Sequence, residues 1–597
     1  MQTLDLFPIG NCAASGLIDP AGRLVWACAP RVDGDPVFSA LLGGAAAEGQ
    51  DGQGFWAIEM EDQAQARQTY LRNTPIVRTE LTDRSGATLE IIDFCPRYRM
   101  FGRMYRPLAF VRRIRPLSGA PVIRIKLRPT RSWGEHAAET TSGSNHIRYL
   151  LGHTTLRLTT NAPASHVTSE RLFRLEDPLD FFLGPDEALE NDVGATAERM
   201  QHETTDYWRG WVRTLSVPLD YQEAVIRAAI ALKLCAVEET GAIVAALTTS
   251  IPEHADSGRN WDYRYCWLRD AYYVVQALNR LGVADLLENY LRYLRNLISR
   301  AKGGHIQPVY GVGLEPALVE RFAEHLPGYR DMGPVRIGNQ AHEHLQHDVY
   351  GQIILSTVQA FFDQRLLRPA TVEDFRELEP VGQRAFELHD QPDASLWEFR
   401  GRAAVHTYSA VMCWAACDRL GNAAAQLGLR DRADFWNERA AKVRATIEER
   451  AFHKDLGRFA ATFDGEELDA SLLQLVDVRF VAADDPRMAA TIAAIEKGLR
   501  RGSHLLRYAL PDDFGEPKTA FNICTFWFIE ALHLSGRTDE ARTLFEEMLS
   551  HRSPAGLLSE DLSFETGELW GNYPQTYSLV GLINCAMLLS RPWTAVR

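Results

Sequence analysis

The chain of 597 residues is 46% hydrophobic and 24% charged, so it is long and apolar enough to bury a large core. At about 150 residues per domain, this length predicts about two to four domains. The formal net charge is −14 at pH 7, and the basic residues are scattered along the chain. We therefore expect neither a nucleic-acid partner nor binding to an anionic membrane surface.

The start of the chain and its cysteines both favour a cytoplasmic protein. Residues Met1 to Pro8 lack the basic and apolar segments of a signal peptide, and no run of about 18 uncharged apolar residues occurs. The nine cysteines are odd in number and form no C-x-x-C pair. We expect them to be reduced residues of the core.

Residues 1–200 contain short runs in which apolar and polar residues alternate. The clearest runs lie at residues 23–28, 88–94, 122–127 and 155–160. Such alternation is typical of antiparallel strands with one buried face. It predicts an N-terminal antiparallel β-sandwich.

The pattern becomes helical after residue 200. Residues 201–219 are predicted to form a helical linker, and residues 220–597 a mostly α-helical domain. In this domain apolar residues recur at the spacing of one helix face, for example at 224–232 and 526–534. Such stretches recur without a fixed sequence repeat. If the helices close into a ring, they form an all-α (α/α)6 barrel.

Four segments of the helical region carry aromatic and charged residues where plain loops carry small polar ones. Sugar rings present apolar C–H faces and a rim of hydroxyl groups, so a sugar site needs flat aromatics beside paired donors and acceptors. These segments therefore predict a carbohydrate site. They span residues 260–270, 334–339, 395–401 and 557–574.

The first of these segments resembles a family signature. Asp262-Tyr-Arg-Tyr-Cys-Trp-Leu-Arg-Asp270 is similar to the D-Y-x-Y-x-W-x-R-D pattern of family 15 glycoside hydrolases, the glucoamylases and bacterial trehalases. Ser395-Leu-Trp-Glu398 and Leu558-Ser-Glu560 resemble the segments that bear the family's general acid and general base. The opening Ile9 to Asp19 resembles the trehalase-like N-terminal domain of bacterial members. The resemblance covers essentially the whole chain and implies a β-sandwich followed by an (α/α)6 barrel.

The resemblance also implies roles for individual residues. It makes Glu398 the general acid and Glu560 the general base of an exo-acting, inverting α-glucoside hydrolase. The expected substrate contacts are Tyr263 and Trp267 as walls of the subsite for the non-reducing-end glucose, Arg269, Asp270 and Arg507 as partners of its hydroxyls, and Arg336, Asn339, Trp397 and Trp570 as further contacts. No cofactor is expected.

Two carboxyl groups suit this chemistry. One must be protonated to assist the leaving oxygen, and the other must be ionised to activate water on the opposite face of the sugar. In an inverting enzyme they stand roughly 6.5 to 9.5 Å apart to leave room for that water. Asp561 is an adjacent competitor for the role of the base.

The substrate is an oligosaccharide or disaccharide, and two departures from the glucoamylase pattern favour trehalose. Phe399 and Arg400 follow the acid where glucoamylases usually carry a second glutamate. The aromatic residue downstream of the base is Tyr577 instead of tryptophan. Glucoamylase and isomaltooligosaccharide hydrolase activities remain the alternatives, and a homo-oligomer is left open.

Other readings of these residues stay open at this point. The pair Arg269 and Asp270 also suits an ordinary buried ion pair, and the aromatics also suit core packing. A phosphorylase needs only one catalytic carboxyl, and a non-catalytic carbohydrate-binding protein needs neither. The run His342 to His347 lacks the second histidine of H-E-x-x-H, because Gln346 stands there, so we expect no catalytic metal.

Overall fold

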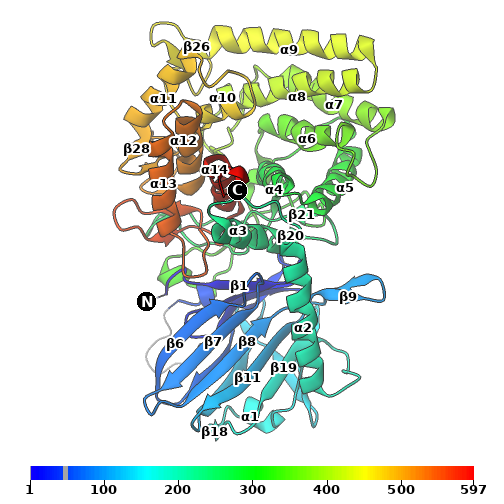
Figure 1. Cartoon of the computed structure of the whole chain (residues 1–597), viewed down its shortest axis with the longest axis vertical. Coiled ribbons are helices and arrows are strands. Elements are labelled where there is room, and N and C mark those ends of the chain that lie inside the picture. The colour runs from blue at the N-terminus through cyan, green and yellow to red at the C-terminus, as the bar shows by residue number, and fades with distance from the viewer. Residues whose placement is uncertain (1, 45–51, 597) are drawn as a thin grey trace.

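The computed structural model describes residues 2–44 and 52–596. It contains a β-sheet domain, drawn below, and a helical domain, drawn above (Figure 1). The predicted order of a β-sandwich followed by an (α/α)6 barrel is confirmed. Among the described residues, no helix is both long and apolar enough to cross a membrane.

Two antiparallel sheets form the N-terminal domain. The first has the strand order β1-β2-β3-β5-β12-β18, with β4 beside β3, and the second the order β15-β16-β17-β19-β11-β8-β7-β6. The first sheet comprises β1 Phe7–Gly10, β2 Ser15–Ile18, β3 Leu24–Ala29, β4 Asp35–Phe38, β5 Phe55–Met60, β12 Val122–Arg128 and β18 Phe173–Arg174. The second comprises β6 Gln63–Tyr70, β7 Val77–Asp83, β8 Thr88–Phe94, β11 Phe110–Ser118, β15 Glu139–Ser142, β16 His146–Leu150, β17 Thr155–Thr160 and β19 Leu179–Pro185.

Apolar side chains join the two sheets face to face. Trp56 on β5 meets Phe181 on β19 with ring centroids 6.1 Å apart, and Phe38 meets Phe110 at 6.4 Å. The four runs that alternate in the sequence are strands β3, β8, β12 and β17, as predicted. Alternation indicates strands here because every second side chain points into the space between the sheets.

A long helix, α2 Val193–Val212, leads from the sandwich to the barrel. Asp192 caps its start by accepting a hydrogen bond from the backbone of Ala195. The helix packs against β19 and the short strand β9 Tyr98–Met100. The predicted boundary at residue 200 lies inside this helix, and the division of the chain at 200 and 219 stays a prediction.

The helical domain is a ring of paired helices. The inner helices are α4 Leu268–Arg280, α6 Asp348–Val358, α8 Thr407–Gln426, α10 Gln474–Asp477, α12 Asn522–Leu534 and α14 Thr576–Leu589. The outer helices are α3 Gln222–Leu234, α5 Ala284–Ala301, α7 Val372–Leu388, α9 Arg430–Arg450, α11 Pro486–Leu499 and α13 Thr538–Ser550. The inner ring closes because α14 contacts α4. A 3-10 helix, Ala470–Leu473, precedes α10 and contacts both α10 and α12, so it completes the inner ring between them.

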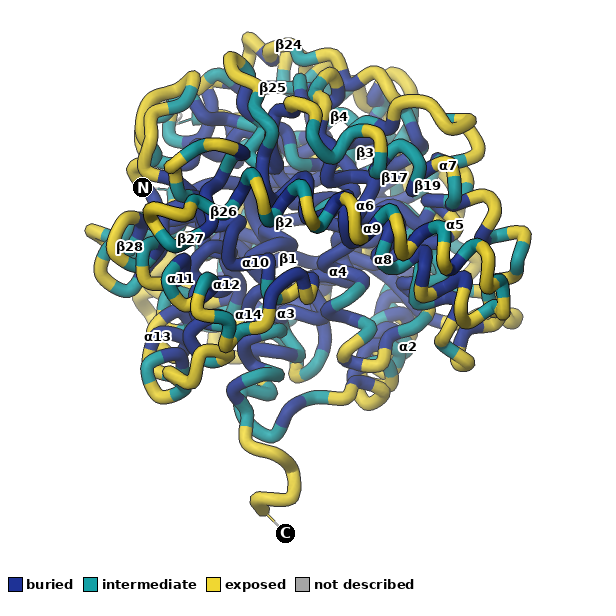
Figure 2. Tube along the Cα trace, turned by 90° about the horizontal axis from the view of Figure 1, so that it is seen from above, coloured by how far each residue is buried: buried dark blue, intermediate teal, exposed yellow. Residues whose placement is uncertain are grey.

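The composition of each helix fits its place in the ring. Nearly every residue of α6 and α12 is buried, as expected for helices covered on all sides. The outer helix α5 is amphipathic and buries a leucine and tyrosine stripe. Buried residues accordingly gather toward the middle of the ring and exposed ones along its edge (Figure 2).

The two domains share one continuous apolar core. Trp26 of the sandwich donates from its indole to the carbonyl of Leu247 at 2.8 Å, and Tyr573 donates its hydroxyl to the carbonyl of Leu6 at 2.8 Å. The sandwich thus contacts the loops that lead into inner helices α4 and α14. The same end of the barrel carries the predicted site.

Candidate active site

A single pocket gathers residues from the loops that precede the inner helices. Its empty volume is about 790 Å³, including the space at its mouth. The lining comes from the segments before α4, α6, α8 and α12 and from the start of α14. Side chains far apart in the sequence meet here because each such loop ends at the same end of the barrel.

Tyr263 and Trp267 form a bracket between the two predicted catalytic glutamates. The hydroxyl of Tyr263 donates to Oε1 of Glu560 at 2.5 Å. The indole of Trp267 donates to Oε1 of Glu398 at 2.7 Å. Their rings meet edge to face with centroids 5.3 Å apart. The two carboxyl groups are therefore held from opposite ends of one aromatic pair.

Glu398 lies on a tight turn between α7 and α8. Its φ of +62° falls in the left-handed region, which residues other than glycine seldom adopt. Such backbone strain persists only where the surroundings hold it, often at functional sites. Buried Asp393 anchors the turn by accepting hydrogen bonds from the amide of Ser395 at 3.1 Å and the hydroxyl of Ser409 at 2.7 Å.

Glu560 is more deeply buried, just before strand β31 Asp561–Leu562, and is only 1% exposed. Gly571 leaves room for it: a Cβ at that position would lie 2.7 Å from the Cβ of Glu560, and its φ of +75° also favours glycine. The neighbouring Asp561 turns elsewhere and accepts a hydrogen bond from Thr519 at 3.0 Å. Of the two acidic residues, Glu560 is thus the one in contact with the aromatic bracket.

Burial raises the pKa of Glu560 to about 8, with further raising by the charges of Glu253 and Asp270. The Tyr263 hydrogen bond and the charge of Arg507 act in the opposite direction. A base must be ionised, so these two residues favour the form that activates water. Positive charge that develops on the sugar in the transition state also stabilises the carboxylate.

A chain of ion pairs runs behind Glu560. Arg507 pairs with Glu253 at 2.7 Å, and Arg259 pairs with Asp512 at 2.5 Å and faces Glu253 at 3.8 Å. Burial by itself would raise the pKa of Glu253, but Arg507 and Arg259 hold it below its ordinary value. The guanidinium of Arg507 is thereby fixed beside the pocket.

Arg269 and Asp270 lie at the base of the pocket, at the first turn of α4. They pair at 3.3 Å, and Arg269 also lies 3.6 Å from Glu398 and donates to the carbonyl of Leu396 at 2.6 Å. Burial raises the pKa of Asp270 to about 6, although Arg269 lowers it. Tyr273, one turn further along α4, is buried, and its hydroxyl contacts the hydroxyl of Tyr408 at 3.1 Å and the side-chain oxygen of Gln474 at 2.9 Å.

The mouth of the pocket is aromatic and charged. The guanidinium of Arg400 lies 4.7 Å from the ring centroid of Trp261 and 5.7 Å from that of Phe514. It also pairs with Glu320 at 2.9 Å. The backbone amide of Arg400 donates to Asp513 at 2.8 Å, which joins the loops before α8 and α12.

Seven of the predicted contacts line this pocket. They are Tyr263, Trp267, Arg269, Asp270, Asn339, Trp397 and Arg507, together with the acid candidate Glu398. The base candidate Glu560 is not among the lining residues and lies behind Tyr263, from whose hydroxyl it accepts a hydrogen bond. Arg336 lies behind the wall, 5.1 Å from the ring of Trp261 and paired with Glu320. Trp570 lies outside the lining, against Tyr329 and Arg330. The structure therefore does not bring these two into the pocket.

Several lining residues were not singled out from the sequence. They are Glu253, Arg259, Asp512, Asp513 and Phe514. Arg259 adjoins the signature segment, so its neighbours gave a signal for it. Tyr508, which also lines the pocket, resembles with Arg507 a sugar-contacting Arg-Tyr pair of the family. The acidic residues at 512 and 513 had none, because a surface turn has the same composition.

The sandwich supports the site from outside the pocket. Arg264, fully buried, pairs with Asp262 at 2.7 Å and donates to the carbonyl of Gly34 in the sandwich at 2.6 Å. Its guanidinium also lies 4.7 Å from the ring of Trp133. The residue next to Tyr263 is thus held by the N-terminal domain.

No group with the spacing of metal ligands was found in the pocket among the described residues. In that part of the chain one such group occurs, His504, Glu547 and His551, and none of its members lines the pocket. His342, His344 and His347 do not form one. The pocket brings together aromatic walls, four guanidinium groups and several carboxyl groups, among them Glu398, while Glu560 contacts the wall residue Tyr263. This arrangement suits acid and base chemistry on a sugar.

Comparisons with known proteins support the assignment of the fold and identify related proteins. The family model described as glycosyl hydrolases family 15 matches residues 220–587, and that described as trehalase-like, N-terminal matches residues 5–173. A trehalase of Thermoplasma volcanium is 30% identical over 97% of this chain and 92% of its own length. A trehalase of Mycolicibacterium smegmatis is 31% identical over 98% of this chain and 90% of its own length.

A solved structure is similar over the whole fold. The crystal structure of a bacterial glucoamylase complexed with acarbose covers 98% of this chain and 94% of its own, with a TM-score of 0.66. The sequences are 12% identical. At that identity the likeness concerns the fold, which again is a β-sheet domain joined to a helical ring.

Proposed function

The chain belongs to glycosyl hydrolase family 15, and we propose that it is an exo-acting trehalase that hydrolyses α,α-trehalose with inversion. The observation that carries the proposal is the pair of glutamates held apart by Tyr263 and Trp267. Relatives that match nearly the whole chain are trehalases, which favours trehalose over other α-glucosides.

We place the enzyme in the cytoplasm, in keeping with nine buried cysteines that are all free thiols.

Burial along the pocket favours attack at a chain end. The Asp270 side chain at the base is 3% exposed, whereas the Glu398 side chain nearer the mouth is 22% exposed. The terminal glucose therefore occupies the base, between Arg269, Asp270 and Arg507. The leaving glucose occupies the mouth, where Arg400 stacks on Trp261 and Phe514. A short, charged mouth of this kind suits one further sugar and favours a disaccharide.

The reaction follows from the two carboxyl groups. Glu398 donates its proton to the glycosidic oxygen while the bond from that oxygen to C1 breaks. The Glu560 carboxylate takes a proton from a water molecule, whose oxygen attacks C1 from the opposite face. The configuration at C1 is inverted and the base never bonds to the sugar.

The stereochemistry of the products tests this mechanism. Trehalose is expected to release β-glucose from the attacked half and α-glucose from the leaving half, so proton NMR in the first minutes should show a near 1:1 mixture. α-Glucose alone would rule out inversion. Maltose, isomaltose and maltooligosaccharides serve as comparison substrates. If only maltooligosaccharides are cleaved, giving β-glucose, the mechanism holds and the enzyme is a glucoamylase.

Tyr263→Phe is expected to move the ascending limb of the kcat/KM profile to higher pH. In the native protein the hydrogen bond from Tyr263 lowers the pKa of Glu560. The variant lacks this hydrogen bond, so the pKa of Glu560 rises and the base becomes ionised only at higher pH. Tyr265→Phe is the matched control, because the Tyr265 hydroxyl contacts the amide of Gly338 and lies outside the pocket lining. An unchanged limb in Tyr263→Phe would contradict the role of Glu560 as base.

A further inference from the structure

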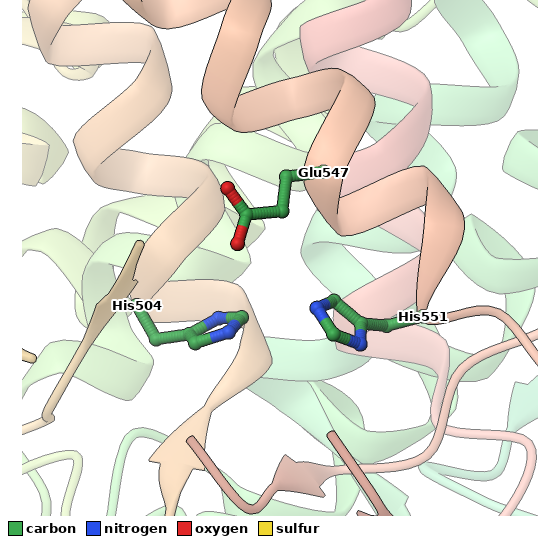
Figure 3. A group of neighbouring side chains, drawn as sticks. All are labelled: His504, Glu547 and His551. Carbon is green, nitrogen blue, oxygen red and sulfur yellow. The ribbon is translucent and has the colours of Figure 1, made fainter. Parts of the chain in front are cut away.

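Two histidines and a glutamate converge outside the active site (Figure 3). His504 lies on strand β29 His504–Leu505, Glu547 on α13, and His551 directly after that helix. One ligand atom of each lies within 4.8 Å of the other two. Figure 3 shows the two imidazole rings and the carboxylate directed toward a common space.

The burial of His504 points to a missing partner. This residue is 5% exposed, and its Nδ1 has no hydrogen-bond partner among the described residues. Buried polar atoms are nearly always paired, so an unpaired ring nitrogen that belongs to a three-residue cluster needs an explanation. The ring of His551 lies 5.3 Å from it, centroid to centroid, tilted by 60°.

The carboxylate of Glu547 is held in place by a neighbour. The hydroxyl of Ser503 donates to its Oε2 at 2.6 Å. A hydrogen bond to a ligating carboxylate is the usual support around a metal ion, because it fixes the direction of the ligand. Glu547 and His551 are also four residues apart, which places both on one side of the end of α13.

We propose that His504, Glu547 and His551 bind a divalent transition-metal ion, with Zn²⁺ as the preferred ion. Two imidazole nitrogens with one carboxylate suit Zn²⁺, whereas Mg²⁺ and Ca²⁺ favour oxygen ligands throughout. The ion ties the end of α13 to the hairpin of β28 Arg500–Arg501 and β29. Arg507 of the active site follows this hairpin directly, so the site is structural and stiffens the approach to the pocket.

The test measures metal binding directly. Chelator-treated protein is incubated with ZnCl₂, passed through a desalting column and analysed for zinc per chain. We expect one equivalent in the native protein and at least tenfold weaker binding in Glu547→Gln and His551→Ala, since even loss of a supporting residue costs 10- to 100-fold in affinity. Both residues are less buried than His504, and these variants are expected to fold.

A matched control is a histidine and a carboxylate that are also four residues apart on a helix but have no third ligand beside them among the described residues. His202 and Asp206 are also four residues apart, with a contact at 3.3 Å. His202→Ala should bind zinc as the native protein does. The melting temperature of native protein should rise with the logarithm of free Zn²⁺, and Co²⁺ should give the visible bands of a tetrahedral site. No retained zinc in the native protein, or full retention by Glu547→Gln and His551→Ala, would overturn the proposal.

Discussion

Glu398→Gln is expected to lower kcat on trehalose by about 10²- to 10⁴-fold while the fold is retained. The amide of glutamine cannot protonate the glycosidic oxygen. The unprotonated sugar is a poor leaving group, so the glycosidic bond breaks slowly. Its carbonyl oxygen can still accept the hydrogen bond that Trp267 donates to Oε1 of Glu398. Steady-state kinetics and melting temperature measure the two effects separately.

A substrate with a better leaving group separates the acid from the base. Fluoride leaves without protonation, so α-glucosyl fluoride should be hydrolysed by Glu398→Gln with a much smaller loss than trehalose. Glu560→Gln should lose activity on both substrates, because both need an activated water. If the two variants show the opposite pattern, Glu560, whose pKa is raised to about 8 by burial, is the acid. Glu343→Gln, at an exposed carboxylate outside the pocket lining, is the control.

The spacing of apolar residues along the chain predicted the individual strands and helices, because it reflects the buried face of each element. The alternating run at 88–94 predicts a strand, and it is β8 between two neighbours of the sheet. The stripe at 224–232 predicts a helix, and it is α3. Ring closure was not visible in any one helix, since it depends on contacts between α14 and α4. The family resemblance supplied that step.

The site was predictable where residues adjoin the family signature and less so elsewhere. Tyr263, Trp267, Arg269 and Asp270 all lie in the signature segment of residues 262–270 at the start of α4, so one motif locates them all. Trp570 shares a predicted segment with Glu560, yet its ring packs against Tyr329. Trp570 is the cross-strand partner of Asp561 and shares its face of the strand pair, whereas Glu560, one residue before Asp561, points to the other face, which a composition pattern does not resolve.

Contacts between distant loops gave no signal in the sequence. Glu253 and Arg507 are separated by 254 positions and meet only because the ring brings their loops together. The cluster of His504 with Glu547 and His551 has the same origin, since its members belong to a hairpin and a helix end. Such groups depend on tertiary packing, and no local pattern specifies it.

Glu560→Gln is expected to lower kcat by at least about 10²-fold, because a neutral amide takes no proton from water. It is also expected to stabilise the fold at high pH. The pKa of Glu560 is raised by burial from 4.5 in the unfolded chain to about 8 in the folded protein. The folded state therefore favours the protonated carboxyl, and native protein loses stability as pH rises from about 4.5 to 8.

The variant lacks this titration, so the difference in stability should grow with pH. We expect the free energy of unfolding of Glu560→Gln minus that of native protein to increase from pH 5 to pH 8, by an amount of the order of a few kcal/mol. The difference between their melting temperatures should increase in the same direction. Denaturant unfolding at each pH gives the energies. Glu343→Gln is the control, because the Glu343 side chain is 62% exposed and lies outside the pocket lining. A constant difference for Glu560→Gln would mean that the buried carboxyl does not titrate over this range, which would contradict the raised pKa of Glu560.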